Sequence, residues 1–165
     1  MRKLVVIRGN SSSGKTTVAL ELQKMLGRNT MLISQDVIRR DILYVKDGEN
    51  TLALPLLKEL LLYGYAHSEI VILEGILRSD WYKPLFELAV QLFQTNIYAY
   101  YFDLTFEETL KRHQTSPKCT KFGEKEMRKW WCEKDYVSIL KETTITFEKD
   151  VKSIVNEIYY NVLNH

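Results

Sequence analysis

The amino-terminal part of the chain carries the spacing of a phosphate-binding loop, G-x-x-x-x-G-K-[ST]. Glycines at both ends let the backbone curl so that successive amide groups point at phosphate oxygens, and three small serines leave room for that approach. Lys15 would reach the β- and γ-phosphates of a nucleoside triphosphate, and the Thr16 hydroxyl would bind Mg²⁺. We therefore expect the nucleotide to lie on Gly9, Asn10, Ser11, Ser12, Ser13, Gly14, Lys15, Thr16 and Thr17.

A second pair of charged residues, Asp36 and Arg39, follows an apolar run and offers the groups that an acceptor hydroxyl needs. If a helix begins at Asp36, the two side chains lie one turn apart on the same face. The carboxylate would position the hydroxyl and accept its proton, while the guanidinium would anchor the acceptor. In the alternative, Asp36 caps the helix and Arg39 is a solvated charge. Ligands bind at the carboxyl edge of open α/β sheets, which favours the functional interpretation.

Glu74 comes directly after the four apolar residues 70–73, so it should lie at the tip of a buried strand. An acid at a strand tip opposite a phosphate-binding loop looks like a Walker B position, where it holds Mg²⁺ through water or orients the acceptor. We therefore expect Thr16 and Glu74 to form the metal site. A plain strand-end carboxylate is the alternative.

Five short apolar runs alternate with stretches of helical periodicity, the order typical of a parallel sheet covered by helices on both faces. A first helix would place Val18, Leu22, Met25 and Leu26 on one stripe and stop at Gly27. Neither a repeat nor a linker marks a domain boundary, so we expect a single α/β domain. That domain would cover residues 1–165, with strands at 4–8, 31–34, 70–73, 97–102 and 144–147.

Cap residues predict where several helices begin. Ser79 or Asp80 would cap a helix over residues 81–93. Thr105 and the glutamate three residues later have the spacing of a capping box, so another helix should start there. Asp150 would cap a final amphipathic helix.

The least regular part of the chain is residues 114–123, a polar and basic stretch that we predict to be a mobile surface loop. His113, at the end of the preceding helix, is expected at the surface. A helix with Trp130 and Trp131 should follow, one tryptophan packing inward and the other partly exposed.

Composition limits the classes of function. The 23 Lys and Arg residues and 21 Asp and Glu residues give a net charge of +2, which disfavours a nucleic-acid-coating surface. Cys119 and Cys132 lack the spacings of zinc sites and are expected to be reduced bystanders. No apolar run approaches the roughly 18 residues of a membrane span, and the apolar stretch at the amino end is too short for a secretory signal. We therefore expect a cytoplasmic protein with no membrane partner.

The chain resembles the small P-loop kinases of the nucleoside and nucleotide kinase-like group, which includes chloramphenicol phosphotransferase, zeta toxins, gluconate kinase and the 5′-kinase domain of polynucleotide kinase. The resemblance rests on the glycine-rich loop, on Asp36-x-x-Arg39, on Glu74 and on a basic segment further along, and it spans about residues 4–130. It implies a three-layer P-loop NTPase fold with a five-stranded parallel sheet in the order 2-3-1-4-5 and helices on both faces. It also implies ATP with Mg²⁺ and transfer of the γ-phosphoryl group to a hydroxyl or a phosphate.

The resemblance further implies a small basic lid, about residues 113–128, that closes over the phosphates. Arg112 is our first choice for the cation on the γ-phosphate, because it leaves its helix where the loop starts, and Arg128 is the second. For each, a solvated surface charge is the alternative. Lids of this group often carry two arginines close together, whereas here Ser116 and Lys118 follow Arg112, so the identity of that cation stays open.

Together these residues predict an ATP-dependent kinase for a small hydroxylated acceptor, with nucleosides among the candidates. Lys15 and a lid arginine would neutralise the transferring group, while Asp36 and Arg39 handle the acceptor. Three alternatives stay open: a nucleoside monophosphate kinase, with Arg39, Arg40 and Arg78 on the acceptor phosphate; a polynucleotide 5′-kinase; and a nucleotide-binding regulator without an acceptor. The acceptor itself, the choice between ATP and GTP, and the oligomeric state are also open.

Overall fold

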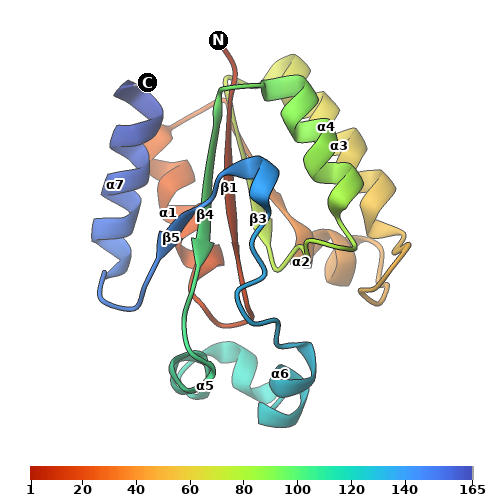
Figure 1. The fold of residues 1–165 in the computed structure, drawn as a ribbon, viewed down its shortest axis with the longest axis vertical. Helices are drawn as coiled ribbons and strands as arrows, with labels where there is room; N and C mark the ends of the chain where they lie inside the picture. The colour runs from red at the N-terminus through yellow and green to blue at the C-terminus, as the bar shows by residue number, and fades with distance from the viewer. Residues whose placement is uncertain (165) are drawn as a thin grey trace.

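The computed structural model describes residues 1–164, and its central element is a parallel sheet (Figure 1). The strands are β1 (Lys3–Gly9), β2 (Thr30–Ser34), β3 (Ile70–Gly75), β4 (Ile97–Phe102) and β5 (Thr143–Ile145). Within residues 1–164 these five strands lie in the order β2-β3-β1-β4-β5, which confirms the predicted topology. The register pairs Ile7 of β1 and Ser34 of β2 with Glu74 of β3, so the carboxyl ends of the three strands meet at one edge.

Helices cover both faces of the sheet, as predicted. Figure 1 shows α1 and α7 on one side and α3 and α4 on the other, with α5 and α6 beyond the carboxyl ends of the strands. The helical elements are α1 (Lys15–Leu26), α2 (Gln35–Val37), the π-helical turn η1 (Ile38–Ile42), α3 (Ala53–His67), α4 (Lys83–Phe93), α5 (Phe106–Gln114), the 3₁₀ turn η2 (Pro117–Thr120), α6 (Glu124–Trp130), the 3₁₀ turn η3 (Ser138–Leu140) and α7 (Val151–Asn164).

The apolar residues of β1 alternate between two cores. Val5 and Ile7 join the cluster under α1 and α7, while Leu4 and Val6 join the cluster under α3 and α4. Because successive side chains of a strand point to opposite faces, a strand buried on both sides must be apolar at nearly every position. That is why the predicted runs, which are continuous rather than alternating, became the strands of a covered parallel sheet.

Two of the three predicted caps are confirmed. Thr105 forms both bonds of the capping box, and Asp150 accepts the amide of Ser153 at 2.7 Å. The helix predicted over residues 81–93 is present as α4, but its predicted cap was wrong: the helix begins at Lys83 after Tyr82, while Ser79 is engaged elsewhere. Tertiary contacts of the serine displaced the local capping preference.

Two smaller predictions also need correction. Met25 is 42% exposed, so it does not belong to the buried stripe of α1. The last strand is shorter than expected, since β5 ends at Ile145 and Phe147 is exposed. Among the described residues, no helix combines the length and the apolarity that crossing a membrane requires.

Candidate active site

The glycine-rich loop closes tightly between β1 and α1. Gly9 has φ +148° and Gly14 φ +99°, in the region that favours glycine. A Cβ on Gly9 would lie 2.8 Å from the Cβ of Phe102, so no larger residue fits there. Lys15 folds back over the loop and donates from Nζ to the Asn10 carbonyl at 2.7 Å and to Ser13 Oγ at 3.3 Å. The loop therefore holds its lysine against its own backbone, in the strand-loop-helix context that the motif requires.

The buried position of Lys15 changes its acidity. Burial lowers the pKa of the ammonium group to about 8, although the nearby carboxylate of Glu74 opposes that shift. A buried cation of this kind gains from an anionic ligand that replaces its lost hydration.

Glu74 lies at the tip of β3 beside the loop. Its carboxylate accepts hydrogen bonds from Ser34 Oγ at 2.5 Å and from Thr16 Oγ1 at 3.3 and 3.4 Å. A buried carboxylate next to a threonine hydroxyl is an all-oxygen set that suits Mg²⁺. Among residues 1–164, no group of three or more His, Cys, Asp or Glu side chains is placed to hold a metal. The two side chains thus fit a Mg²⁺ that takes its other ligands from phosphate and water, as this ion commonly does.

Asp36 is surrounded by cations. Its Oδ1 lies 2.7 Å from Arg40 Nε and 3.1 Å from an Arg39 nitrogen, and Oδ2 lies 3.8 Å from Lys118 Nζ. Burial alone would raise the pKa of this carboxyl group, but the hydrogen bond from Arg40 and the charges of the neighbouring cations outweigh it and hold the pKa below its usual range. The carboxylate is therefore ionised at neutral pH.

A cavity of about 500 Å³ brings these groups together. Residues from the loop, from α2 and η1, from the tip of β3 and from the segment around α6 all line it. Of the predicted site residues, it is lined by Ser11, Ser12, Lys15, Thr16, Asp36, Arg39 and Glu74. The loop that would hold a triphosphate and the pair that would hold an acceptor therefore open on one space.

The two predicted lid arginines lie outside this lining. Arg112 instead contacts the loop from another side, with Nη1 3.4 Å from the Ser13 carbonyl. Arg128 pairs with Glu124 at 2.7 Å and covers the ring of Phe106. Their roles toward a γ-phosphate stay predictions. Among the described residues, the cations that line the cavity from this part of the chain are Lys118 and Lys129.

Known proteins resemble the chain in structure. No protein-family model and no curated protein matches it. A gluconokinase from Sinorhizobium meliloti 1021 has a TM-score of 0.69 at 15% identity over 99% of this chain and 94% of that one. An APS kinase from Mycobacterium tuberculosis, in complex with AMPPNP and APS, has a TM-score of 0.64 at 16% identity over 99% and 98%. The chain has the fold of the P-loop small-molecule kinases.

A shikimate kinase from Aquifex aeolicus gives the same result, with a TM-score of 0.57 at 20% identity over 98% of this chain and 96% of that one. Within the P-loop kinase fold, function depends on the side chains that each protein places around the cavity. Several side chains around the site were not predicted from the sequence.

His113 is one such residue, and its predicted surface position was wrong. The side chain is only 3% exposed, because it bridges the glycine-rich loop and the segment after α5. Nδ1 lies 3.2 Å from Ser12 Oγ, Nε2 lies 2.6 Å from the Phe122 carbonyl, and the ring stacks on that of Phe122. A histidine facing the loop from a helix end could not be told from a solvated one by sequence alone.

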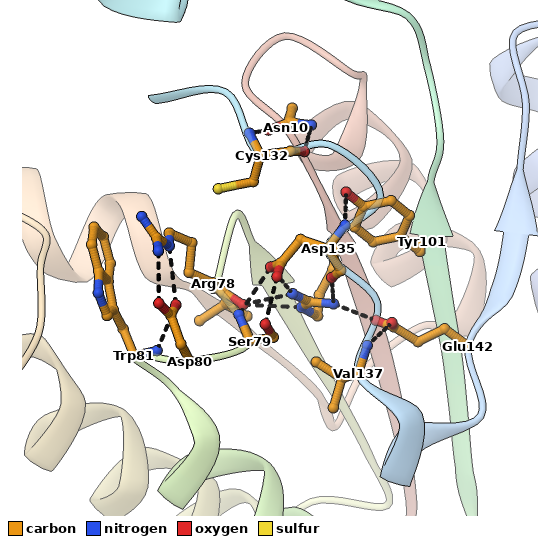
Figure 2. A network of polar contacts seen from close by, with 12 residues as sticks. Asn10, Arg78, Ser79, Asp80, Trp81, Tyr101, Cys132, Asp135, Val137 and Glu142 are labelled. Carbon is orange, nitrogen blue, oxygen red and sulfur yellow. Dashed lines mark hydrogen bonds and ion pairs between the residues drawn. The ribbon is translucent and has the colours of Figure 1, made fainter. Parts of the chain in front are cut away.

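Asn10 uses its side chain in a way that the motif does not specify. Its amide nitrogen donates to the Cys132 carbonyl at 2.7 Å, and its amide oxygen accepts the Cys132 amide at 2.9 Å (Figure 2). This reciprocal pair fastens the glycine-rich loop to the chain that leaves α6. The backbone of Asn10 remains part of the predicted nucleotide site.

A buried arginine lies beneath the loop. Arg8 is fully buried near the end of β1, and its guanidinium binds Asp135 and Glu142, each at 2.8 Å, together with the Leu77 carbonyl. Asp135 in turn accepts hydrogen bonds from the amide and hydroxyl of Ser79. The network joins β1, the loop after β3 and the chain beyond α6, and of these three segments the loop after β3 lines the cavity, with Ile76 and Arg78.

A second missed network fixes another wall. Gln35 donates from Nε2 to Asp47 at 2.9 Å and to the Tyr82 hydroxyl at 3.0 Å, and that hydroxyl donates to Asp47 at 2.5 Å. Burial raises the pKa of the Tyr82 hydroxyl, as does the hydrogen bond to Asp47, so it remains a donor. Asp47 lines the cavity, and its carboxylate already accepts hydrogen bonds from Gln35 and Tyr82.

Proposed function

We propose that this protein is a phosphotransferase that moves the γ-phosphoryl group of ATP to a hydroxyl group of a small-molecule acceptor. The observation that carries the proposal is the shared cavity, in which the Lys15 loop and the Asp36–Arg39 pair face the same space. A regulator that only senses a nucleotide would have no use for a carboxylate held by cations beside the phosphates. The APS kinase that resembles the chain is itself a kinase solved with AMPPNP and APS, which supports this class of reaction.

In the proposed reaction, the acceptor hydroxyl oxygen forms a bond to the γ-phosphorus while the bond from that phosphorus to the β-γ bridging oxygen breaks and ADP leaves. Asp36 orients the hydroxyl and receives its proton, and Arg39 anchors the acceptor. Because the pKa of Asp36 is lowered, the carboxylate is ionised and free to accept, and the proton leaves the hydroxyl oxygen late, as expected for a loose transition state. Mg²⁺ held by Thr16 and Glu74 would neutralise phosphate charge.

We also propose that residues 113–128 act as the lid of the site. Lys118 of this segment already lines the cavity, as does Lys129 directly after it, and Arg112 directly before it contacts the loop at Ser13. Closure of this segment around a triphosphate would expel water and strengthen each of these charge interactions.

The test of the proposed function is a panel of acceptors with Mg·ATP, followed by detection of the phosphorylated product. The panel should contain sugars, nucleosides, nucleoside monophosphates, antibiotics with free hydroxyls and a short oligonucleotide with a 5′-hydroxyl. Product from a small hydroxylated acceptor supports the proposal. Product only from monophosphates or only from the oligonucleotide would assign one of the alternative kinases, and tight nucleotide binding with no product anywhere would favour a regulator.

Lys15→Ala should weaken both nucleotide binding and transfer. Loss of a charge-assisted hydrogen bond to phosphate predicts a decrease in Mg·ADP affinity of about 10- to 100-fold. Calorimetry with Mg·ADP measures it, and Lys24→Ala is a matched control because Lys24 is an exposed lysine further along the same helix. A variant that binds and turns over like the wild type would remove Lys15 from the site.

The lowered pKa of Lys15 predicts a pH dependence of nucleotide binding. The phosphates favour the charged ammonium, and in the free protein that charge is lost as the pH rises through about 8. Affinity for Mg·ADP should therefore decrease above that pH, by up to about tenfold per pH unit. Calorimetry on both sides of this pH tests the slope. In Lys15→Ala the slope should vanish, and an unchanged slope there would assign it to another group.

A further inference from the structure

The cavity carries an excess of positive charge. Among the described residues, seven cationic side chains and three carboxylates line it. Lys15 belongs to the glycine-rich loop, Lys118 to the proposed lid and Lys129 to α6 just beyond the lid, where a triphosphate accounts for them. The other cations come from elements on the acceptor side, namely η1, the loop that follows it and the loop after β3: Arg39, Arg40, Lys46 and Arg78.

The carboxylates in the lining do not balance these four cations. Asp47 is occupied by Gln35 and Tyr82, and Glu74 by Ser34 and Thr16. That leaves the single carboxylate of Asp36, which Arg39, Arg40 and Lys118 share. From outside the lining Asp80 pairs with Arg78, so two carboxylates face Arg39, Arg40, Lys46, Arg78 and Lys118. A cation cluster with more positive than negative charges is stabilised by a bound anion.

Two of the arginines lie over aromatic rings. The guanidinium carbon of Arg78 lies 4.0 Å from the ring centre of Trp81, and that of Arg40 lies 5.7 Å from Phe122 and 6.0 Å from Trp130. Stacking occupies the face of a guanidinium and leaves the N–H groups at its edge able to donate to a planar or tetrahedral anion. Arg78 also donates to Asp80 at 3.0 and 2.6 Å, which fixes its orientation at the rim.

Arg39 supplies a further donor. Its Nε is buried and finds no hydrogen-bond partner within residues 1–164. A buried charged donor without an acceptor is costly, and few such groups persist in folded proteins without a reason. A shift of the Arg39 side chain toward an anion in the cavity that it lines would give this Nε an acceptor.

We infer that the acceptor carries an anionic group, a carboxylate or a phosphate, in addition to the hydroxyl that receives the phosphoryl group, and that Arg39, Arg40 and Arg78 bind this anion. The inference rests on the proposed function for the hydroxyl transfer. It narrows the acceptor from any hydroxylated small molecule to hydroxylated acids and phosphate monoesters. Neutral sugars, neutral nucleosides and uncharged antibiotics are excluded as the preferred substrates.

Matched pairs of acceptors test the inference in the transfer reaction. Each pair shares a hydroxylated scaffold and differs in the anion: glucose against gluconate, glycerol against glycerol 3-phosphate, and uridine against uridine 5′-monophosphate. Product phosphorylated on a hydroxyl of the anionic member of a pair, with at least about tenfold lower transfer to the neutral one, supports the inference, whereas a diphosphate formed on the acceptor's own phosphate overturns it. Equal transfer within a pair overturns it and leaves the proposed function standing.

A binding measurement tests the inferred anion site without the choice of an acceptor scaffold. Inorganic phosphate is titrated into protein saturated with Mg·ADP, with tryptophan fluorescence as the readout because Trp81 and Trp130 line the cavity. Arg78→Gln should weaken phosphate binding about 10- to 100-fold. Lys83→Gln is the matched control, since this exposed lysine also follows β3 but lies outside the lining.

The outcomes separate the inference from the proposed function. Phosphate binding that Arg78→Gln reduces and Lys83→Gln preserves supports the anion site. Absent phosphate binding, or equal binding in the two variants, overturns it. If Mg·ADP does not bind at all, the proposed function fails, and the same comparison of variants in the nucleotide-free protein still tests the anion site.

Discussion

Asp36→Asn is expected to lower phosphoryl transfer by about 10²- to 10⁴-fold, the range typical of a lost acid–base residue, while Mg·ADP binds as in the wild type. The amide keeps the size of the side chain, but it cannot receive the hydroxyl proton and it attracts the three neighbouring cations less strongly. Single-turnover transfer to a confirmed acceptor measures the chemical step, and calorimetry with Mg·ADP measures binding.

Asp41→Asn is the matched control for this variant. Asp41 lies on η1, the turn that directly follows the α2 helix of Asp36, is exposed and is outside the cavity lining, so its loss removes one negative charge close to Asp36 in the chain. Its transfer rate should stay within about twofold of the wild type, as for an ordinary surface substitution. Equal transfer by Asp36→Asn and Asp41→Asn would show that the reaction does not need the Asp36 carboxylate.

The parts of the site that are local in sequence could be predicted before the structure. The loop from Gly9 to Thr16 lies between a strand and a helix that are its immediate neighbours, so eight consecutive residues specify both its shape and its position. Asp36 and Glu74 follow apolar runs, and the rule that parallel strands share a carboxyl edge places both beside the loop. The register, in which β2 and β3 pair at Ser34 and Glu74, agrees with that expectation.

The parts that depend on distant segments could not be predicted. Arg8 is separated from its partner Asp135 by 127 residues, and Asn10 is separated from Cys132 by 122. Residue type gave one unused signal: an arginine that ends an apolar strand must be buried, and a buried charge requires partners. Nothing in the spacing, however, indicates which of the 21 acidic residues those partners are.

The cations around the cavity also include some that could be predicted from the sequence and some that could not. Arg39 follows Asp36 at helical spacing and was found from the sequence. Lys118 lies in the turn η2 and Lys129 in the short helix α6, where periodicity says little about which side chains face inward. The prediction therefore located the basic segment but favoured Arg112 and Arg128, which lie outside the cavity lining.

Arg8→Met should lower the free energy of unfolding by about 3–5 kcal/mol, the range for removing one member of a buried ion pair. The wild-type guanidinium makes five hydrogen bonds, to Leu77, Asp135 and Glu142, which matches its five N–H groups. It also lies between two aromatic rings, with its carbon 5.2 Å from the ring centre of Phe86 and 5.5 Å from that of Tyr101. Methionine fills much of the space but leaves two carboxylates without their cation.

Urea denaturation of three variants distinguishes a lost ion pair from a simple change in packing. Arg8→Lys should also be destabilised, because an ammonium has three donors and lacks the planar fork. Arg8→Met combined with Glu142→Met should recover part of the lost stability, because the buried Glu142 carboxylate that Arg8→Met leaves without a cation is removed as well. Arg28→Met, at an exposed arginine, should change stability by less than about 0.5 kcal/mol. If the double variant is no more stable than Arg8→Met alone, the unpaired Glu142 charge is not the source of the loss.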